Sequence, residues 1–387
     1  MCTEADIKIS VIMPIYNACD YLRPAMDSVL SQTIREIEVI CIDDGSTDSS
    51  YEIIKEYQKA DERVRIETET NAGPALARNN GIKRARGEYL AFLDADDFYE
   101  PTFLEALYSA ARSKELDIAI ASYDIYNSAK ARFEEAARAD HIEIYSDGKV
   151  TSKSENPDLI LSSTTGSAWN KIFRREFVLQ KGLVFLPDVR MYEDVYFTVT
   201  ALSLAERVSM DKRILVHHRV YNEQARAKGF SKYYSQVPVV YFKIKEFLMQ
   251  NGMYAPLSDS YLNLSAGRCY KIFNILSKDS KERFWDLLHS EYAEKLGWKS
   301  CVADDFENED VCKFALNVCV YTFKQYKKRL AKGIEVPRPT LPQQVKETVE
   351  KVKRVSFFSR IFGKRKKYSK RDTVFYTMSL FHILFSF

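Results

Sequence analysis

Three carboxylates stand close together in the segment Asp94-Ala95-Asp96-Asp97. They follow the apolar run 89–93, which has the length of a strand, and precede a helical stretch that begins at Pro101. Like charges at this spacing repel one another, and a bound cation would relieve the repulsion. Mg²⁺ and Mn²⁺ prefer oxygen ligands and are commonly held by one or two carboxylates together with substrate phosphates. A solvated acidic turn that caps the next helix is the alternative interpretation.

The same segment does not fit a calcium-binding loop. In a loop that began at Asp94, the fifth and sixth positions would need a ligand and a glycine. Phe98 and Tyr99 occupy those positions. The carboxylates therefore favour a metal that is shared with a phosphate-bearing ligand.

Strand-like and helix-like segments alternate through the first 122 residues. Mostly apolar runs of strand length lie at 8–15, 38–42, 64–68, 89–93 and 117–121. Helical stretches lie between them at 22–32, 49–60, 74–85 and 101–113. This alternation predicts a mostly parallel sheet with helices on both faces, in which ligands bind beyond the carboxyl ends of the strands. Polar segments follow the first four strands at 16–17, 43–46, 71–73 and 94–97, so we expect them to share one edge of the sheet.

Several motifs occur in the order and at the spacing of one known family. They are VIMPIYN (11–17), SVLSQT (28–33), DDGSTD (43–48), NAG with ARN (71–79), and GEY with FLDADD (87–97). Together they resemble the inverting nucleotide-sugar glycosyltransferases of family 2, over about residues 5–220. The resemblance implies an α/β fold of the GT-A (Rossmann-like) type, with a mostly parallel sheet and helices on both faces.

The resemblance implies a nucleoside site at the first two strand ends. Pro14 and Tyr16 would pack against the base, and Asp44, or alternatively Asp43, would accept the uracil N–H. A carboxylate suits this role because a charged acceptor strengthens the hydrogen bond. An ordinary turn that caps the following helix is the alternative, and both interpretations can hold together.

The resemblance also implies a diphosphate and metal site. Arg78 is similar to the family's nucleotide-contacting arginine, although it would also suit a helix surface. Asp94 and Ala95 belong to the donor site, where Asp94 would touch the ribose or the metal. Asp96 would ligate the Mn²⁺ or Mg²⁺ that bridges the diphosphate. His218 is a second candidate ligand, but the match to the family is poor there, and a satisfied surface histidine is the alternative.

A second acidic pair, Glu193-Asp194, lies far downstream. Inverting transfer needs a base that removes the proton of the acceptor hydroxyl while its oxygen attacks the anomeric carbon opposite the leaving diphosphate. By resemblance this base is Asp194, with Glu193 as a supporting or acceptor-binding group. Outside this context, the pair would indicate an ordinary helix start.

The segment 166–173 resembles the acceptor-side segment of the family. It assigns Trp169, Asn170 and Lys171 to the acceptor side of the site. Aromatic rings stack on sugars but also fill cores, so Trp169 is either a pocket wall or a core residue.

The length of 387 residues and the hydrophobic content of 46% allow one large domain with an extension. We expect a catalytic domain at 1–227, with a nucleotide-sugar half at about 1–122 and an acceptor half at about 123–227. Apolar residues then recur at intervals of three and four, which predicts a C-terminal helical extension at 228–335. Prolines mark the start of a tail at 336–387.

The tail contains a basic and an apolar segment. Residues 346–372 include eleven Lys or Arg against three acidic residues, a net charge of +8. The apolar run 374–387 is 14 residues long, shorter than the roughly 20 residues that span a bilayer as a helix. We expect the tail to dock on an anionic membrane surface, and packing of the apolar run against the helical extension is the alternative.

These features together favour an intracellular enzyme. The N-terminus lacks the basic and apolar regions of a secretory leader, and the seven cysteines show no Cys-x-x-Cys spacing. We therefore expect free thiols, no zinc site, and a cytoplasmic location that is peripheral at the inner face of the cell membrane.

The expected activity is transfer of a sugar, of hexosyl type, from a UDP-sugar to a hydroxyl of a cell-surface glycan or a lipid-linked precursor, as in polysaccharide biosynthesis. No nucleic-acid partner is expected. One alternative is a nucleotide-sugar-binding protein without catalysis. A less favoured one is a phosphohydrolase with an Asp-x-Asp nucleophile, whose aspartates belong after the first strand, whereas Asp94 follows the fourth.

Overall fold

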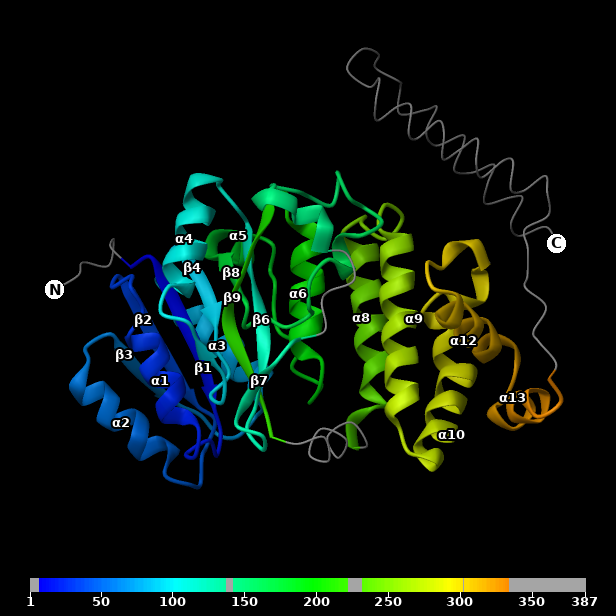
Figure 1. Ribbon diagram of the computed structural model, residues 1–387, viewed down its shortest axis with the longest axis horizontal. Coiled ribbons are helices and arrows are strands. Elements are labelled where there is room, and N and C mark those ends of the chain that lie inside the picture. The colour runs from blue at the N-terminus through cyan, green and yellow to red at the C-terminus, as the bar shows by residue number, and fades with distance from the viewer. Residues whose placement is uncertain (1–6, 137–141, 222–231, 302, 334–387) are drawn as a thin grey trace, which may run out of the picture. The chain divides into compact units, whose positions relative to one another are not determined.

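The computed structural model describes residues 7–136, 142–221, 232–301 and 303–333 (Figure 1). Within these residues a nine-stranded sheet has the order β3-β2-β1-β4-β8-β6-β9-β5, and β7 pairs with β6. The strands are β1 (Ile9–Ile15), β2 (Ile37–Asp43), β3 (Val64–Thr68), β4 (Tyr89–Phe92), β5 (Phe98–Tyr99), β6 (Ile118–Asn127), β7 (Arg132–Glu134), β8 (Lys171–Arg174) and β9 (Val208–Val220).

Helices cover the sheet and continue beyond it. The α-helices are α1 (Leu22–Leu30), α2 (Ser50–Ala60), α3 (Pro74–Arg84), α4 (Phe103–Ser113), α5 (Arg175–Gln180), α6 (Glu193–Leu204), α8 (Gln236–Gln250), α9 (Ser258–Ile275), α10 (Lys278–Leu287), α11 (Ala293–Lys295), α12 (Glu309–Val320) and α13 (Phe323–Leu330). Short 3₁₀ segments are η2 (Ile142–Gly148), η3 (Ile160–Ser162), η5 (Trp298–Ser300) and η6 (Ala303–Asp305), and η4 (Leu288–Tyr292) is a π-helical turn.

The predicted fold class is confirmed, and the sheet proves to be mixed. Strands β1 to β4 pair in parallel, as the alternating pattern predicts, and β6 pairs in parallel with β9. Strands β5, β7 and β8 were not predicted, and each pairs antiparallel with its neighbours. The expected boundary between the two halves, at about residue 122, falls inside β6, which continues to Asn127.

The two faces of the sheet bury different side chains because successive residues of a strand point to opposite faces. Val11 and Val39 belong to a core with α1, α2 and α4. Ile12 and Ile40 belong to a second core that contains residues of α3, α6 and the helices from α8 onward. This second core includes Trp285, so the helical layer of α8, α9, α10 and α12 is continuous with the sheet through α6 (Figure 1).

Three further points concern the predicted tail, helices that could cross a membrane, and the cysteines. The predicted tail at 336–387 lies outside the described residues. Among the described residues, none of the helices is both long enough and apolar enough to cross a membrane. The six cysteines in the described part of the chain are free thiols, and Cys2 lies outside it.

Candidate active site

A cleft of about 650 Å³ lies at the carboxyl ends of the first strands. It is lined by Pro14, Ile15, Tyr16, Asn17, Ala18, Tyr21, Asp44, Asn71, Gly73, Pro74, Arg78, Asp94, Ala95, Asp96, Arg190, Glu193 and Tyr221. The segments that follow β1, β2, β3 and β4 all contribute to this wall, which confirms that they share one edge of the sheet. Of the predicted site residues, Asp43, Trp169, Asn170, Lys171, Asp194 and His218 do not line the cleft.

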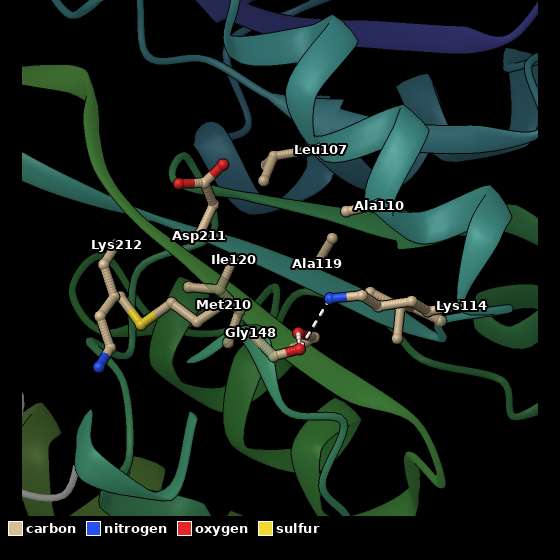
Figure 2. A pocket seen from close by; sticks show the side chains of 11 residues that line it. Leu107, Ala110, Lys114, Ala119, Ile120, Gly148, Met210, Asp211 and Lys212 are labelled. Atoms are coloured by element: carbon tan, nitrogen blue, oxygen red, sulfur yellow. Dashed lines mark hydrogen bonds between the residues drawn. The ribbon is translucent and has the colours of Figure 1, made fainter. Parts of the chain in front are cut away.

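A second cavity, of about 310 Å³, lies between α4 and the strands β6 and β9 (Figure 2). The Lys114 Nζ donates a hydrogen bond of 2.7 Å to the Gly148 carbonyl across it. Its lining contains none of the predicted site residues. The cleft at the strand ends is therefore the candidate active site.

Asp44 holds the loop after β3 against the end of β2 in the cleft wall. This carboxylate is buried, and its two oxygens accept backbone N–H groups from Ala72 at 2.7 Å and Gly73 at 2.8 Å. Each carboxylate oxygen has a further lone pair, so Asp44 can still accept an N–H from a ligand. Asp43 instead accepts the Ser46 N–H at 3.2 Å and closes the turn behind the wall. The geometry thus favours Asp44 over Asp43 as the base-contacting carboxylate, with the half-exposed Tyr16 beside it.

Asp96 is held with its carboxylate facing the cleft. The Tyr221 hydroxyl donates to Asp96 Oδ2 at 2.7 Å, and the Arg219 Nε donates to the Asp96 carbonyl at 2.8 Å. Burial and the neighbouring Asp94 raise the pKa of Asp96, because both disfavour its charged form. A cation at this point would reverse that effect.

The side chains of the cleft do not complete a metal site by themselves, so a bound ligand would have to supply the remaining ligating atoms. Within the described residues, no group of three or more His, Cys, Asp or Glu side chains could hold a metal ion. Asp96 offers one carboxylate, which matches the way Mg²⁺ is usually held by few protein ligands and by substrate phosphates. The residues present therefore fit a Mn²⁺ or Mg²⁺ that is shared with a diphosphate.

His218 is paired with the buried carboxylate of Asp97. Its Nδ1 lies 3.0 Å from Asp97 Oδ1, and its ring stacks on Trp169 with centroids 5.1 Å apart. Burial raises the pKa of Asp97 to about 6, although His218 opposes the shift. Burial lowers the pKa of His218, but Asp97 outweighs this and raises it to about 9. Asp97 contacts only Nδ1, so the other ring nitrogen, Nε2, can bind a metal when the imidazole is neutral.

Arg78 joins the two acidic segments across the cleft. Its Nη2 donates to Asp94 at 2.5 Å and its Nη1 donates to Glu193 at 3.0 Å, and the side chain is buried. Its guanidinium lies over the Phe185 ring, 5.2 Å from the centroid. Burial alone would lower the pKa of Arg78, but the surrounding carboxylates raise it above its usual value.

Asp194 stands in the first turn of α6, next to the cleft wall. The Val195 N–H donates to its Oδ1 at 2.8 Å. Burial is the main cause that raises the pKa of Asp194 to about 7, Glu193 adds to it, and Arg78 opposes it. Tyr192, the residue just before α6, has a left-handed backbone conformation with φ of 68°. A carboxylate with this pKa is half deprotonated near neutral pH, which suits a general base.

The predicted acceptor-side residues lie behind the wall. Lys171 is fully buried, and its Nζ donates to the Thr165 carbonyl at 2.9 Å, the Ser167 carbonyl at 2.7 Å and Asn170 Oδ1 at 2.7 Å. Burial lowers the pKa of Lys171 to about 7, although three acceptors at these distances favour the ammonium form. These contacts fix the segment that follows η3, and Trp169 is buried beside it.

Some cleft residues were missed from the sequence. They are Asn17, Tyr21, Asn71, Arg190 and Tyr221. Asn17 and Asn71 fall inside quoted motifs, so the motif itself was the available signal. Tyr21 and Tyr221 carry no such signal, because their ring contact, with centroids 4.7 Å apart, joins segments distant in the chain.

The sheet and its acidic cleft agree with the class of protein that the sequence motifs resemble, the GT-A glycosyltransferases. Residues 10–179 match the family described as Glycosyl transferase family 2. The chain is 30% identical over 269 residues to the putative glycosyltransferase EpsH of Bacillus subtilis (strain 168), which covers 67% of this chain and 76% of that protein. The protein therefore belongs to glycosyltransferase family 2.

One further relative and two solved structures are also similar to the chain. The poly(ribitol-phosphate) beta-glucosyltransferase of Bacillus spizizenii is 30% identical over 213 residues, which is 53% of this chain and 31% of that protein. Residues 1–349 of S. aureus TarS, solved in complex with UDP, superpose with a TM-score of 0.64 at 18% identity and cover 87% of this chain and 94% of that one. A TarS complex with UDP-GlcNAc gives the same TM-score, over 84% of this chain and 92% of that one. The structural likeness establishes the GT-A fold.

Proposed function

We propose that this enzyme is an inverting, metal-dependent transferase of hexosyl type that uses a UDP-linked sugar. The observation that carries the proposal is Arg78, which holds donor-side Asp94 and acceptor-side Glu193 together in one cleft. The solved TarS complexes contain UDP and UDP-GlcNAc, which supports a uridine donor.

On the donor side, Asp44 accepts the imide N–H of uracil while Pro14 and Tyr16 pack against the base. Asp94 and Ala95 line the ribose and diphosphate part of the cleft. A Mn²⁺ or Mg²⁺ held by Asp96 would supply positive charge that stabilises the departing diphosphate. His218 remains a second candidate ligand, because a carboxylate that accepts the Nδ1–H of a histidine leaves its Nε2 able to bind a metal.

On the acceptor side, Asp194 accepts the proton of the attacking hydroxyl. As that oxygen bonds to the anomeric carbon, the bond from this carbon to the diphosphate breaks and UDP leaves with the electron pair. A single displacement of this kind inverts the anomeric configuration. Glu193 is neutralised by Arg78 and supports the base, and the buried Asn170 and Lys171 keep the segment beneath the acceptor in place.

The proposed acceptor is a hydroxyl of a cell-surface glycan or of its lipid-linked precursor. One relative is named for transfer to poly(ribitol-phosphate), which supports a cell-surface polymer as the class of acceptor. We therefore propose that the enzyme acts in polysaccharide biosynthesis at the cytoplasmic face of the membrane.

A donor screen tests the proposed function. We expect UDP-sugars, but not GDP- or dTDP-sugars, to raise the melting temperature and to be hydrolysed slowly, in both cases more strongly with Mn²⁺ than with EDTA. Stabilisation by GDP-sugars alone would contradict the uridine donor. Binding of UDP-sugars without hydrolysis or transfer to any acceptor would favour the non-catalytic alternative.

We also expect the tail to bring the enzyme to anionic membranes. Each basic residue near such a surface contributes about 1 kcal/mol, and an adjacent apolar segment supplies the second anchor that stable attachment needs. The full chain should sediment with anionic vesicles at low salt and less at high salt, whereas a chain that ends at Thr340 should stay in solution and still bind UDP. Equal partitioning of the two would mean that the apolar run does not reach the membrane.

A further inference from the structure

Arg190 stands in the cleft wall without an ionic partner. Within the described residues, no carboxylate forms an ion pair with its exposed side chain. The other arginine of the wall, Arg78, is committed to Asp94 and Glu193. The cleft therefore holds one cationic side chain that is not neutralised by the protein itself.

The guanidinium of Arg190 is directed to the inside of the cleft by Gly73. Its Nη1 occupies the space that a Cβ on Gly73 would need, and its Cζ lies 3.2 Å from that Cβ position. Gly73 has φ of 98°, a backbone conformation that residues other than glycine rarely adopt. The close approach of the Arg190 guanidinium to this residue therefore depends on glycine. The Arg190 main chain is fixed as well, because its N–H donates to Gln236 Oε1 at 2.8 Å.

Arg190 lies in the same wall as the residues proposed to bind the donor. The Gly73 that it covers donates its N–H to Asp44, the residue at the nucleoside end. In the sequence, Arg190 is three residues before Glu193, which also lines the cleft and which Arg78 connects to Asp94. A nucleotide sugar whose base is held at Asp44 would place its diphosphate further along the same cleft, whose wall includes Asp94, Asp96 and Arg190.

We propose that Arg190 binds the diphosphate of the donor and stabilises it as the leaving group; this inference rests on the proposed function. A guanidinium presents paired N–H donors that match phosphate oxygens, and its charge does not change with pH in the working range. The wall also contains the carboxylates Asp44, Asp94, Asp96 and Glu193, which would repel a diphosphate. Arg190, a cation in the same wall, offsets part of that repulsion.

Calorimetric titration of the full chain with UDP and with uridine, both in Mn²⁺, tests the inference. Arg190→Gln should weaken UDP binding about 10-fold or more and leave uridine binding unchanged, since only UDP carries the diphosphate. Arg190→Lys should retain part of the UDP affinity because it keeps the charge without the fork. Lys181→Gln, which removes an exposed charge outside the cleft, is the matched control and should bind both ligands like the unmodified protein.

The other outcomes overturn the inference. UDP affinity in Arg190→Gln equal to that of the unmodified protein would overturn it, and so would an equal loss for uridine and UDP. A loss restricted to turnover of phosphate-bearing acceptors, compared with phosphate-free ones, would assign the guanidinium to the acceptor instead. A protein that binds UDP independently of Arg190 keeps the proposed function, whereas an unmodified protein that binds no UDP removes both.

Discussion

Asp194→Asn is expected to lower turnover by about 10²-fold or more while donor affinity stays nearly unchanged, because the amide keeps the shape but cannot accept the proton. The pH profile gives a second measurement. Since the pKa of Asp194 is raised to about 7, its deprotonated, active form increases as pH rises. The kcat/KM of the unmodified enzyme should therefore climb through about pH 7 to a plateau, and the residual activity of Asp194→Asn should lack this rise.

Two companion variants separate the base from its neighbours. Glu193→Gln should keep measurable activity and move the rise in kcat/KM to lower pH, because Glu193 contributes to the raised pKa of Asp194. Asp188→Asn changes an exposed carboxylate on the same loop and should behave like the unmodified enzyme. Near-normal transfer by Asp194→Asn, together with loss of activity in Glu193→Gln, would assign the base to Glu193.

Asp96→Asn is expected to abolish the metal-dependent part of UDP binding. The amide still offers an oxygen to the Tyr221 hydroxyl, so the fold should be kept, but it no longer carries the charge that a metal requires. With Mn²⁺ present we expect UDP affinity to fall by about 10-fold, which is about 1.4 kcal/mol, and transfer to fall by about 10²-fold or more. Asp96→Ala should give the same result, with Tyr221 left to bond to water.

UDP binding by the unmodified protein and by each variant is measured by titration, once with Mn²⁺ and once with EDTA. In EDTA the unmodified protein and Asp96→Asn should bind UDP alike, because no metal is present to distinguish them. Asp20→Asn, an exposed carboxylate outside the cleft lining, is the control for the loss of one negative charge. Undiminished Mn²⁺-dependent affinity in a folded Asp96→Asn would move the metal away from this residue.

The parts of the fold that the sequence predicts are those with a local signal. Strands β1, β2, β4 and the first half of β6 are mostly apolar runs that the sheet buries, β3 is a more polar run, and the helices between them were placed to within a few residues. Strands β7 and β8 contain charged residues over three or four positions, which is too short for a periodic pattern. β7 is a strand because it pairs with the neighbouring end of β6, and β8 because it pairs with residues of β6 and β4 that are distant in the chain.

The candidate site likewise contains residues that the sequence predicts and contacts that it does not. Asp94, Asp96 and Glu193 were found from motifs, and each lines the cleft. The partners of Arg78 could not be predicted, because they lie 16 and 115 residues away in the chain. The burial of Lys171 depends on carbonyl groups of a folded loop, and a sequence pattern carries no information on where such carbonyls point.

The place of β8 in the sheet also constrains how the chain folds during synthesis. This strand lies between β4 and β6 but follows both in the chain, so the sheet stays in two parts until the ribosome has released Lys171–Arg174. Before that point β4 and β6 each present an unpaired edge to other nascent chains, which is the condition that favours aggregation. The segments that follow β1 to β4 are therefore synthesised before the strand that completes the sheet. A chain that ended before β8 would expose the edge of β4, and we expect it to aggregate.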